Sequence, residues 1–152
     1  MTIDNSEKKV LGITLALIGL FVFSLLYAKG KYKSDVPECL PYDKAYEQPK
    51  VNKLDEKTYQ VFAVASMWQF EPNEITVPAG SEVDFYLTSK DVVHGFNIAP
   101  KNVNMMAIHG GINKTTVKFD KPGVYDIICH EYCGVGHQNM RARVIVNYPE
   151  AK

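Results

Sequence analysis

The sequence predicts an all-β sandwich attached to a single N-terminal membrane helix. An uncharged, apolar run of nineteen residues near the amino terminus indicates the helix. Beyond residue 57, short strand-like segments alternate with turn-forming residues, which is typical of a β-sandwich or barrel. A chain of 152 residues has room for one ordinary domain besides the helix, and 46% apolar residues are sufficient for its core.

The apolar run covers residues 10–28 and would form a helix about 28 Å long at roughly 1.5 Å per residue, enough to span a bilayer core. It is longer than the apolar region of a signal peptide, and Tyr27-Ala28-Lys29 is a poor cleavage site. We therefore expect a retained membrane anchor at residues 1–33, with the transmembrane helix at about 10–28. Lysines flank the run on both sides, so the positive-inside rule leaves its orientation open.

Residues 34–56 contain prolines and scattered charges, which predicts an irregular linker ahead of a domain at residues 57–152. Cys39, the odd third cysteine of the chain, lies in this linker. We expect it to be a free thiol, with an intermolecular disulfide or a role as a copper ligand as the alternatives.

Apolar residues on alternate positions predict the strands of the domain. In residues 82–88 every second side chain is apolar, which gives one buried and one wetter face. Further strands are expected at residues 59–65, 74–77, 115–119, 124–128 and 143–146. Pro78-Ala79-Gly80 and Lys121-Pro122-Gly123 would form turns between them. Such short strands favour an antiparallel sandwich or barrel.

Residues 129–140 combine two cysteines, a histidine and a methionine: Cys129, Cys133, His137 and Met140. Their steps of four, four and three residues allow a tight loop to turn all four side chains toward one point. Thiolate and thioether sulfur are soft donors that select copper. A mononuclear blue copper site uses one cysteine, so the second cysteine indicates two metals that share sulfur.

A zinc site and a disulfide remain open as alternatives for this loop. Zinc would use the cysteines and His137 but would leave Met140 without a role. A disulfide between the two cysteines could form in an oxidising compartment. Haem attachment is excluded, because it requires Cys-x-x-Cys-His. The best source of a second imidazole is His94, since Gly95 after it would let the backbone approach a metal closely.

The sequence resembles subunit II of haem-copper cytochrome c oxidases, the subunit that carries the binuclear copper centre called CuA. His94-Gly95-Phe96 is followed by Cys-x-Glu-x-Cys-Gly-x-x-His-x-x-Met at residues 129–140. Residues 68–73, 77–80 and 121–123 and the N-terminal helix also have counterparts, so the resemblance covers roughly the whole chain. The short form with one helix is most similar to the ba3-type (B family) oxidases. The resemblance narrows the fold to a Greek-key cupredoxin-like sandwich.

The resemblance also implies a set of copper ligands. Cys129 and Cys133 would bridge both coppers as thiolates, and His94 and His137 would each bind one copper. Met140 would be a weak ligand of one copper, and the backbone carbonyl of Glu131 would be a weak ligand of the other. The other two histidines, His109 and His130, match no ligand position.

The implied function is electron transfer within a terminal oxidase of the cell (inner) membrane. The copper domain would lie on the periplasmic, external side and accept electrons from cytochrome c. It would pass them to haem in the catalytic subunit I, where oxygen is reduced to water, and would not be catalytic alone. The net charge of zero argues against a nucleic-acid partner.

Two alternative functions are weaker. A copper carrier or chaperone needs few, labile ligands, and the CuA-like nitrous oxide reductase has a large histidine-rich domain that this sequence lacks.

Three residues have further implied roles, each with an ordinary alternative. Trp68, the only tryptophan, would receive electrons from the donor, or it is a core or interface aromatic. The side chain of Glu131 would reach a magnesium ion at the contact with the catalytic subunit, or it is a hydrogen-bonded loop carboxylate. Glu7 would lie near the mouth of a proton path into the catalytic subunit, or it is a solvated helix-start residue.

Overall fold

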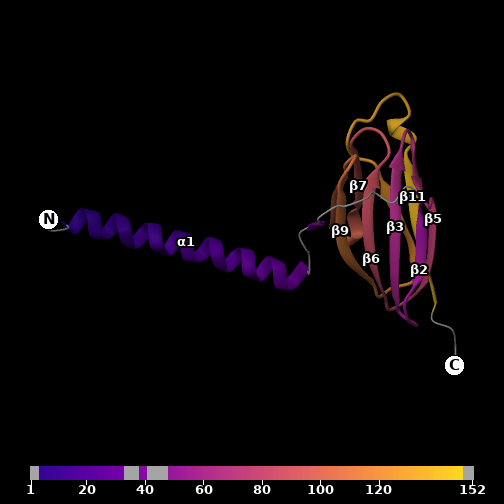
Figure 1. The fold of residues 1–152 in the computed structure, drawn as a ribbon. Helices are drawn as coiled ribbons and strands as arrows, with labels where there is room; N and C mark the ends of the chain where they lie inside the picture. Colours follow the sequence, from indigo (N-terminus) through magenta and orange to yellow (C-terminus); the bar gives the residue numbers. More distant parts are fainter. Residues whose placement is uncertain (1–3, 33–37, 41–47, 149–152) are drawn as a thin grey trace. The chain divides into compact units, whose positions relative to one another are not determined.

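The computed structural model describes residues 4–32, 38–40 and 48–148, and it divides into two compact units, residues 1–34 and 35–152 (Figure 1). The first unit contains one helix, α1 (Asn5–Tyr32). The described residues of the second unit form eleven strands and two short 3-10 turns, η1 (Ala99–Lys101) and η2 (His137–Asn139).

Helix α1 is long and apolar enough to cross a membrane, and its apolar side chains are exposed. It begins with a reciprocal capping box: the Asp4 carboxylate accepts from the N–H groups of Ser6 and Glu7, and Glu7 accepts from the N–H of Asp4 at 2.9 Å. Lys29 and Lys31 in the last turn complement the helix dipole. The helix therefore extends beyond the predicted residues 10–28 at both ends.

Two sheets form the second unit and face each other across one core (Figure 1). The first sheet has the order β1 (Glu38–Leu40), β9 (Ile112–Phe119), β6 (Ser81–Ser89), β3 (Thr58–Ser66) and β2 (Lys50–Lys53), and β4 (Gln69–Glu71) also pairs with β3. The second has the order β5 (Glu74–Pro78), β11 (Arg141–Asn147), β10 (Gly123–Ile128), β7 (His94–Ile98) and β8 (Val103–Ala107). The prediction of a cupredoxin-like sandwich that follows one N-terminal helix in the sequence is confirmed.

Large aromatic side chains join the two sheets. Phe96 of β7 contacts Phe70 at 5.5 Å and Phe85 at 5.6 Å between ring centroids, and Phe85 contacts Phe119 at 6.5 Å. The buried cluster continues without a break into Cys129, Cys133 and Met140. The sulfur atoms of the predicted metal loop are therefore part of the hydrophobic core.

The predicted strands are all present, and the described residues form five further strands that the sequence pattern does not predict: β1, β2, β4, β7 and β8. The segment at residues 34–56 is not wholly irregular, because β1 and β2 lie in it and pair with β9 and β3. Cys39 lies on β1 opposite Asn113, and its side chain is outside the described part of the chain. The expected antiparallel arrangement is wrong for two pairs, β3 with β6 and β5 with β11, which are parallel. After β3 the chain crosses to the other sheet as β5 before it returns as β6, so β6 runs in the same direction as β3.

Candidate metal centre

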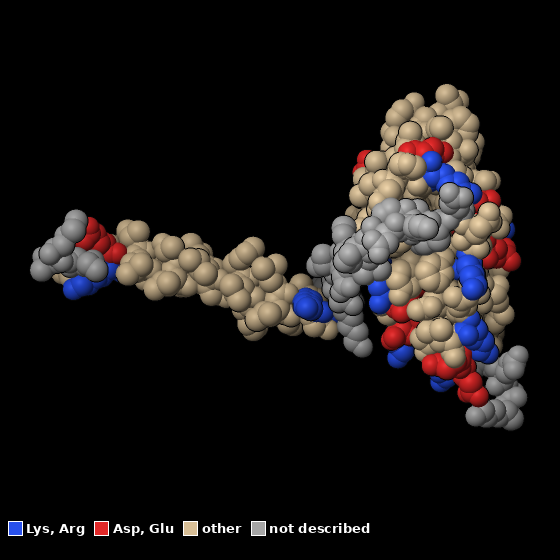
Figure 2. Space-filling view, viewed as in Figure 1, with Lys and Arg blue, Asp and Glu red and all other residues tan. Residues whose placement is uncertain are grey.

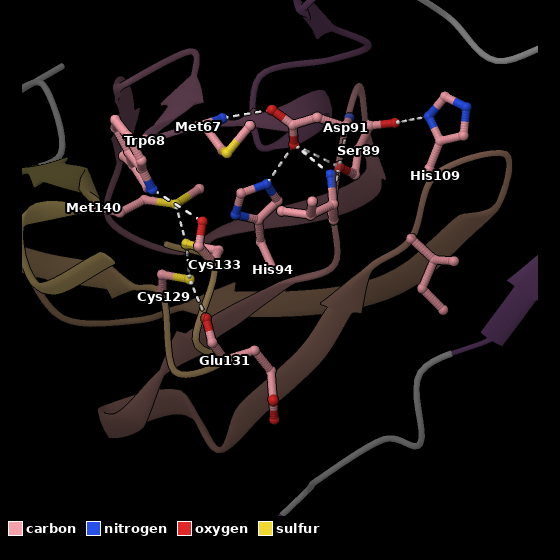
Figure 3. Close-up of polar contacts among 12 residues, drawn as sticks. Met67, Trp68, Ser89, Asp91, His94, His109, Cys129, Glu131, Cys133 and Met140 are labelled. Atoms are coloured by element: carbon pink, nitrogen blue, oxygen red, sulfur yellow. Dashed lines mark hydrogen bonds and ion pairs between the residues drawn. The ribbon is translucent and has the colours of Figure 1, made fainter. Parts of the chain in front are cut away.

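The loop between β10 and β11, residues 129–140, supplies most of the predicted ligands (Figure 3). Antiparallel pairing of the two strands holds its ends, and the N–H of Cys129 donates to the carbonyl of Met140 at 3.2 Å. Within the loop, η2 is closed by the N–H of Met140, which donates to the carbonyl of His137 at 3.1 Å. This turn brings Met140 back beside the cysteines in the core.

Three sulfur atoms meet on the buried side of this loop. Cys133 Sγ lies 3.7 Å from Cys129 Sγ, 3.8 Å from Met140 Sδ and 3.6 Å from His137 Nδ1. Both cysteines are free, so the alternative of a Cys129–Cys133 disulfide does not describe this structure. Two thiolates on one metal, each at about 2.3 Å with a near-tetrahedral angle, would lie roughly 3.8 Å apart. The observed sulfur separation fits shared metal ligation.

His94 brings a buried imidazole to the same sulfur atoms. Its Nε2 lies 2.7 Å from Asp91 Oδ1, and its Nδ1 is buried with no hydrogen-bond partner in the described part of the chain. The ligand atoms of His94, Cys129 and Cys133 lie within 4.8 Å of one another. A buried nitrogen without a partner is costly unless it binds something, and a metal held by the sulfurs would satisfy it. His94 is the first residue of β7, so the sheet fixes its backbone.

Asp91 orients the His94 ring, a role that the sequence pattern does not reveal. Burial acts to raise the pKa of this carboxyl, but hydrogen bonds from His94 and from the N–H groups of Met67 and Val92 outweigh burial and lower the pKa below its ordinary value. The carboxylate is therefore charged at neutral pH and accepts the Nε2–H of His94. That tautomer leaves the lone pair of Nδ1 free for a metal.

Without a metal, the thiol of Cys133 is protonated at neutral pH. Burial, reinforced by the neighbouring Cys129 thiol, raises the pKa of Cys133 to about 11. A metal must therefore displace the proton of Cys133 when it binds.

Glu131 has its backbone and side chain in different surroundings. Its carbonyl oxygen accepts from Cys129 Sγ–H at 3.3 Å and so lies beside the sulfur cluster. Its carboxylate is exposed, with Oε1 3.6 Å from Nδ1 of His130. The ring of His130 in turn packs on Gly95, where an added Cβ would lie 2.6 Å from the ring.

Trp68 lies directly on the ligand loop. Its indole Nε1–H donates to the carbonyl of Cys133 at 3.0 Å, and its ring packs on Gly134 and Gly136. The side chain is 41% exposed, so it contacts both the loop and solvent. Trp68 is thus not a core residue.

The remaining predicted residues lie away from the sulfur cluster or in the other unit. His109 Nδ1 lies 3.2 Å from the carbonyl of Ser89. Glu7 belongs to the capping box of α1 and is exposed. The structure brings together five predicted ligand side chains, with the Glu131 carbonyl beside them: His94, Cys129, Cys133, His137 and Met140.

The described residues match a known family over most of their length. The family model for the periplasmic domain of cytochrome c oxidase subunit II matches residues 44–147. The chain belongs to the cytochrome c oxidase subunit II family. It is thus part of a haem-copper oxidase complex, an oxidoreductase, together with other subunits.

Relatives and solved structures agree with this membership. Cytochrome c oxidase subunit 2 of Thermus thermophilus is 32% identical over 92% of this chain and 90% of its own length, which fits the ba3-type resemblance. A chain in the cryo-EM structure of a heme-copper terminal oxidase dimer is 41% identical, with a TM-score of 0.81 over 94% of this chain and all of that chain. The periplasmic domain of subunit II from Bradyrhizobium japonicum has a TM-score of 0.55 at 24% identity over 59% of this chain and 83% of its own, which supports the fold.

Proposed function

We propose that this subunit accepts single electrons from a cytochrome c at a binuclear CuA centre and passes them to a haem in subunit I, where oxygen is reduced to water. The observation that carries the proposal is the pair of free thiols 3.7 Å apart, with the unpartnered Nδ1 of His94 beside them. A mononuclear copper site needs one thiolate, so a second copper accounts for the second thiol.

The proposed ligand roles follow the geometry. Cys129 and Cys133 would hold the two coppers as thiolates, and His94 and His137 would each contribute one nitrogen. The two weak ligands are the thioether of Met140 and the backbone carbonyl of Glu131. When bound, the copper pair supplies a one-electron couple.

The protein part of the mechanism is rigidity and exclusion of water. His94 and Met140 are 0% exposed, and Cys129 and Cys133 are 4% and 5% exposed. The two cysteines and Met140 sit between two paired strands, and His94 is held by β7 and Asp91. Ligands that are fixed by a sheet and by hydrogen bonds move little when the charge of the site changes, which keeps the reorganisation energy of electron transfer small.

The surface beside the ligand loop suits a weakly charged contact with the donor. Four apolar side chains are exposed there: Met67, Trp68, Tyr132 and Val135. Figure 2 shows the end of the domain that carries this loop with few charged atoms on the visible face. We assign Trp68 as the electron-receiving residue, because it is exposed on one side and hydrogen-bonded to the Cys133 carbonyl on the other.

Location and the remaining partners complete the proposal. Helix α1 would anchor the chain in the cell membrane among lipids, with the copper domain on the periplasmic side, as the family model's description supports. The exposed carboxylate of Glu131 would reach a magnesium ion at the contact with subunit I, since hard oxygen donors suit magnesium. The buried donors argue against a copper carrier, which must exchange its metal rapidly.

The test is to load the full chain with copper in detergent and to measure metal content and the electron paramagnetic resonance spectrum. We expect two coppers per chain and, in the oxidised form, one unpaired electron shared by both nuclei. Cys129→Ser should lose this signal, and Cys39→Ser, the matched control, should keep it. One copper with a four-line spectrum, or one zinc per chain, would contradict the proposal.

A further inference from the structure

We infer that Gly136 is a positioning residue for electron transfer: its missing side chain seats Trp68 flat on the ligand loop, in the contact through which electrons reach the copper site. The inference rests on the proposed role of Trp68 and adds the residue that sets its position. Gly136 is itself not a metal ligand.

The packing of Trp68 on the loop leaves no room for a side chain at residue 136. A Cβ added to Gly136 would lie 2.5 Å from Cδ2, 2.6 Å from Cγ and 2.7 Å from Cε3 of Trp68, and real Cβ atoms essentially never approach so closely. A Cβ added to Gly134 would lie 3.1 Å from Nε1. The indole thus spans both glycines, with its carbon framework over Gly136 and its nitrogen side over Gly134.

The backbone does not explain why residue 136 is glycine. Gly136 has φ −91° and ψ 4°, which other residues also adopt. Gly134 differs, because its φ of +114° favours glycine whatever packs on it. The requirement at residue 136 is therefore steric and comes from the Trp68 ring. For this reason alanine at position 136 tests the ring contact without straining the backbone.

Two contacts then fix the indole, the hydrogen bond from Nε1–H to the Cys133 carbonyl and the close packing on Gly136. An added methyl group would push the ring away from the loop and stretch or break that hydrogen bond. In the electron step the donor haem iron is oxidised by one electron and the copper pair is reduced by one. Trp68 provides the route and is neither oxidised nor reduced overall, and no proton is transferred.

The kinetic test uses the whole oxidase with Gly136→Ala and a reduced cytochrome c. We expect the rate of electron transfer into the copper centre to fall by about tenfold, since small displacements of positioning groups have effects of that order or larger. The copper content and the electron paramagnetic resonance spectrum should be unchanged. The matched control is Gly111→Ala, whose Cβ would make only ordinary contacts, the nearest at 3.7 Å, and which should react at the wild-type rate.

A double-mutant cycle on the full chain in detergent tests the packing of Trp68 on Gly136 independently of the electron-transfer rate. Gly136→Ala should lower the equilibrium constant for folding by about tenfold. In the Trp68→Leu background the same substitution should change it by less than about twofold, because the clashing ring is gone. In Gly136→Ala, the fluorescence of Trp68, the only tryptophan, should also become more accessible to quenchers.

The outcomes separate this inference from the proposed function. If Trp68→Leu slows electron transfer and Gly136→Ala does not, Gly136 has no positioning role while Trp68 keeps its own. If Trp68→Leu also reacts at the wild-type rate, the proposed role of Trp68 is wrong and the inference fails with it. If Gly136→Ala lowers the equilibrium constant for folding equally in the wild-type and the Trp68→Leu chains, the Trp68 ring does not pack on Gly136 as inferred, and the inference is wrong. This comparison decides the question even if Gly136→Ala also loses copper.

Discussion

His94 can present only one nitrogen to a metal, because Asp91 already accepts from the other. The 2.7 Å contact between Nε2 and Asp91 Oδ1 selects the tautomer and fixes the plane of the ring. Asp91 is held in turn by the N–H groups of Met67 and Val92, so it is itself well oriented. The metal affinity of the site should therefore depend on a residue that touches no metal.

Asp91→Ala should lower copper affinity by roughly tenfold to a hundredfold, which is the usual effect of losing the partner of a ligating histidine. Competition with a chelator of known affinity measures it on the full chain. Asp126→Ala, an exposed carboxylate on β10, is the control and should bind copper as the wild type does. Wild-type affinity in Asp91→Ala would show that the ring needs no orienting partner.

The thiol of Cys133 should make the stability of the metal-free chain depend on pH. Its pKa rises from 9.0 to about 11 on folding, mainly through burial. Between these values the folded chain keeps a proton that the unfolded chain has released. The stabilisation is complete below pH 9 and is lost as the pH rises through 11.

The measurement is the urea midpoint of the metal-free chain between pH 8 and 11, followed by Trp68 fluorescence. Cys133→Ala should show a smaller decline of that midpoint than the wild type. The comparison is necessary because Lys101, whose pKa is lowered by burial, contributes a change of the opposite sign just below its ordinary pKa of 10.5. Parallel curves for the two proteins would contradict the shift at Cys133.

At this scale the sequence predicts the ligands but not their supports. Cys129, Cys133, His137 and Met140 are recognisable because residue type and local spacing are sufficient. Asp91 and Gly136 are not, because their roles depend on contacts with segments that are distant in sequence or on a turn geometry that spacing does not reveal. The contact between Trp68 and Cys133 joins residues 65 positions apart.

At the scale of elements, the sequence predicts the long strand β6, which has one exposed and one buried face, but not the strands of three or four residues. β6 alternates through most of its length and was found. β1, β2 and β4 have three or four residues, too few for a period of two to be distinguished from chance. β7 is buried at four of its five positions, so its sequence shows no alternation although it carries His94.

The side chain of Lys101 connects the short turn η1 with the end of β9 and the start of β10. Its Nζ donates to the carbonyl of Lys118 at 2.6 Å and lies 5.3 Å from the ring centroids of both Phe119 and Tyr125. Lys101→Met keeps most of the apolar stem but removes the charge, and it should lower the free energy of unfolding by about 1 kcal/mol.

Urea unfolding of the full chain in detergent measures the effect of Lys101→Met. Lys121→Met, an exposed lysine in the neighbouring turn, is the matched control and should change stability by less than about 0.5 kcal/mol. If both variants unfold at the same urea concentration, the aromatic and carbonyl contacts of Lys101 contribute nothing measurable.

At the scale of the whole molecule, the chain consists of two units with different surfaces. Helix α1 exposes an apolar surface and is long and apolar enough to cross a membrane. The described part of the other unit buries its apolar residues in a core of its own and uses one end of that core for the sulfur site. The apolar run at residues 10–28 and the strand patterns beyond residue 57 predict a membrane anchor and a water-exposed domain, because lipid and water impose opposite patterns on a sequence. They did not predict orientation, since lysines flank the helix at both ends.

Glu7 allows a role of residues 1–34 in proton supply to be tested separately from the proposed role of helix α1 as a membrane anchor. Its carboxylate accepts from the N–H of Asp4 at 2.9 Å, which accounts for an acid at this position by helix capping alone. Glutamine at the same position preserves a capping box, so Glu7→Gln removes the charge and the exchangeable proton but keeps the start of the helix. A loss of activity in this variant cannot then be attributed to an unravelled helix.

If Glu7 collects protons at the mouth of a path into subunit I, Glu7→Gln in the whole complex should slow steady oxygen consumption. The slowing should increase from neutral to alkaline pH, where protons are scarce, and electron transfer into the copper centre should keep its wild-type rate because that site lies in the other unit. Glu7→Ala removes the capping contact as well, and a loss confined to this variant would indicate a capping role only. Turnover of Glu7→Gln at the wild-type level over this pH range would mean that Glu7 serves only to start the helix, and that this subunit acts through electron transfer and anchoring.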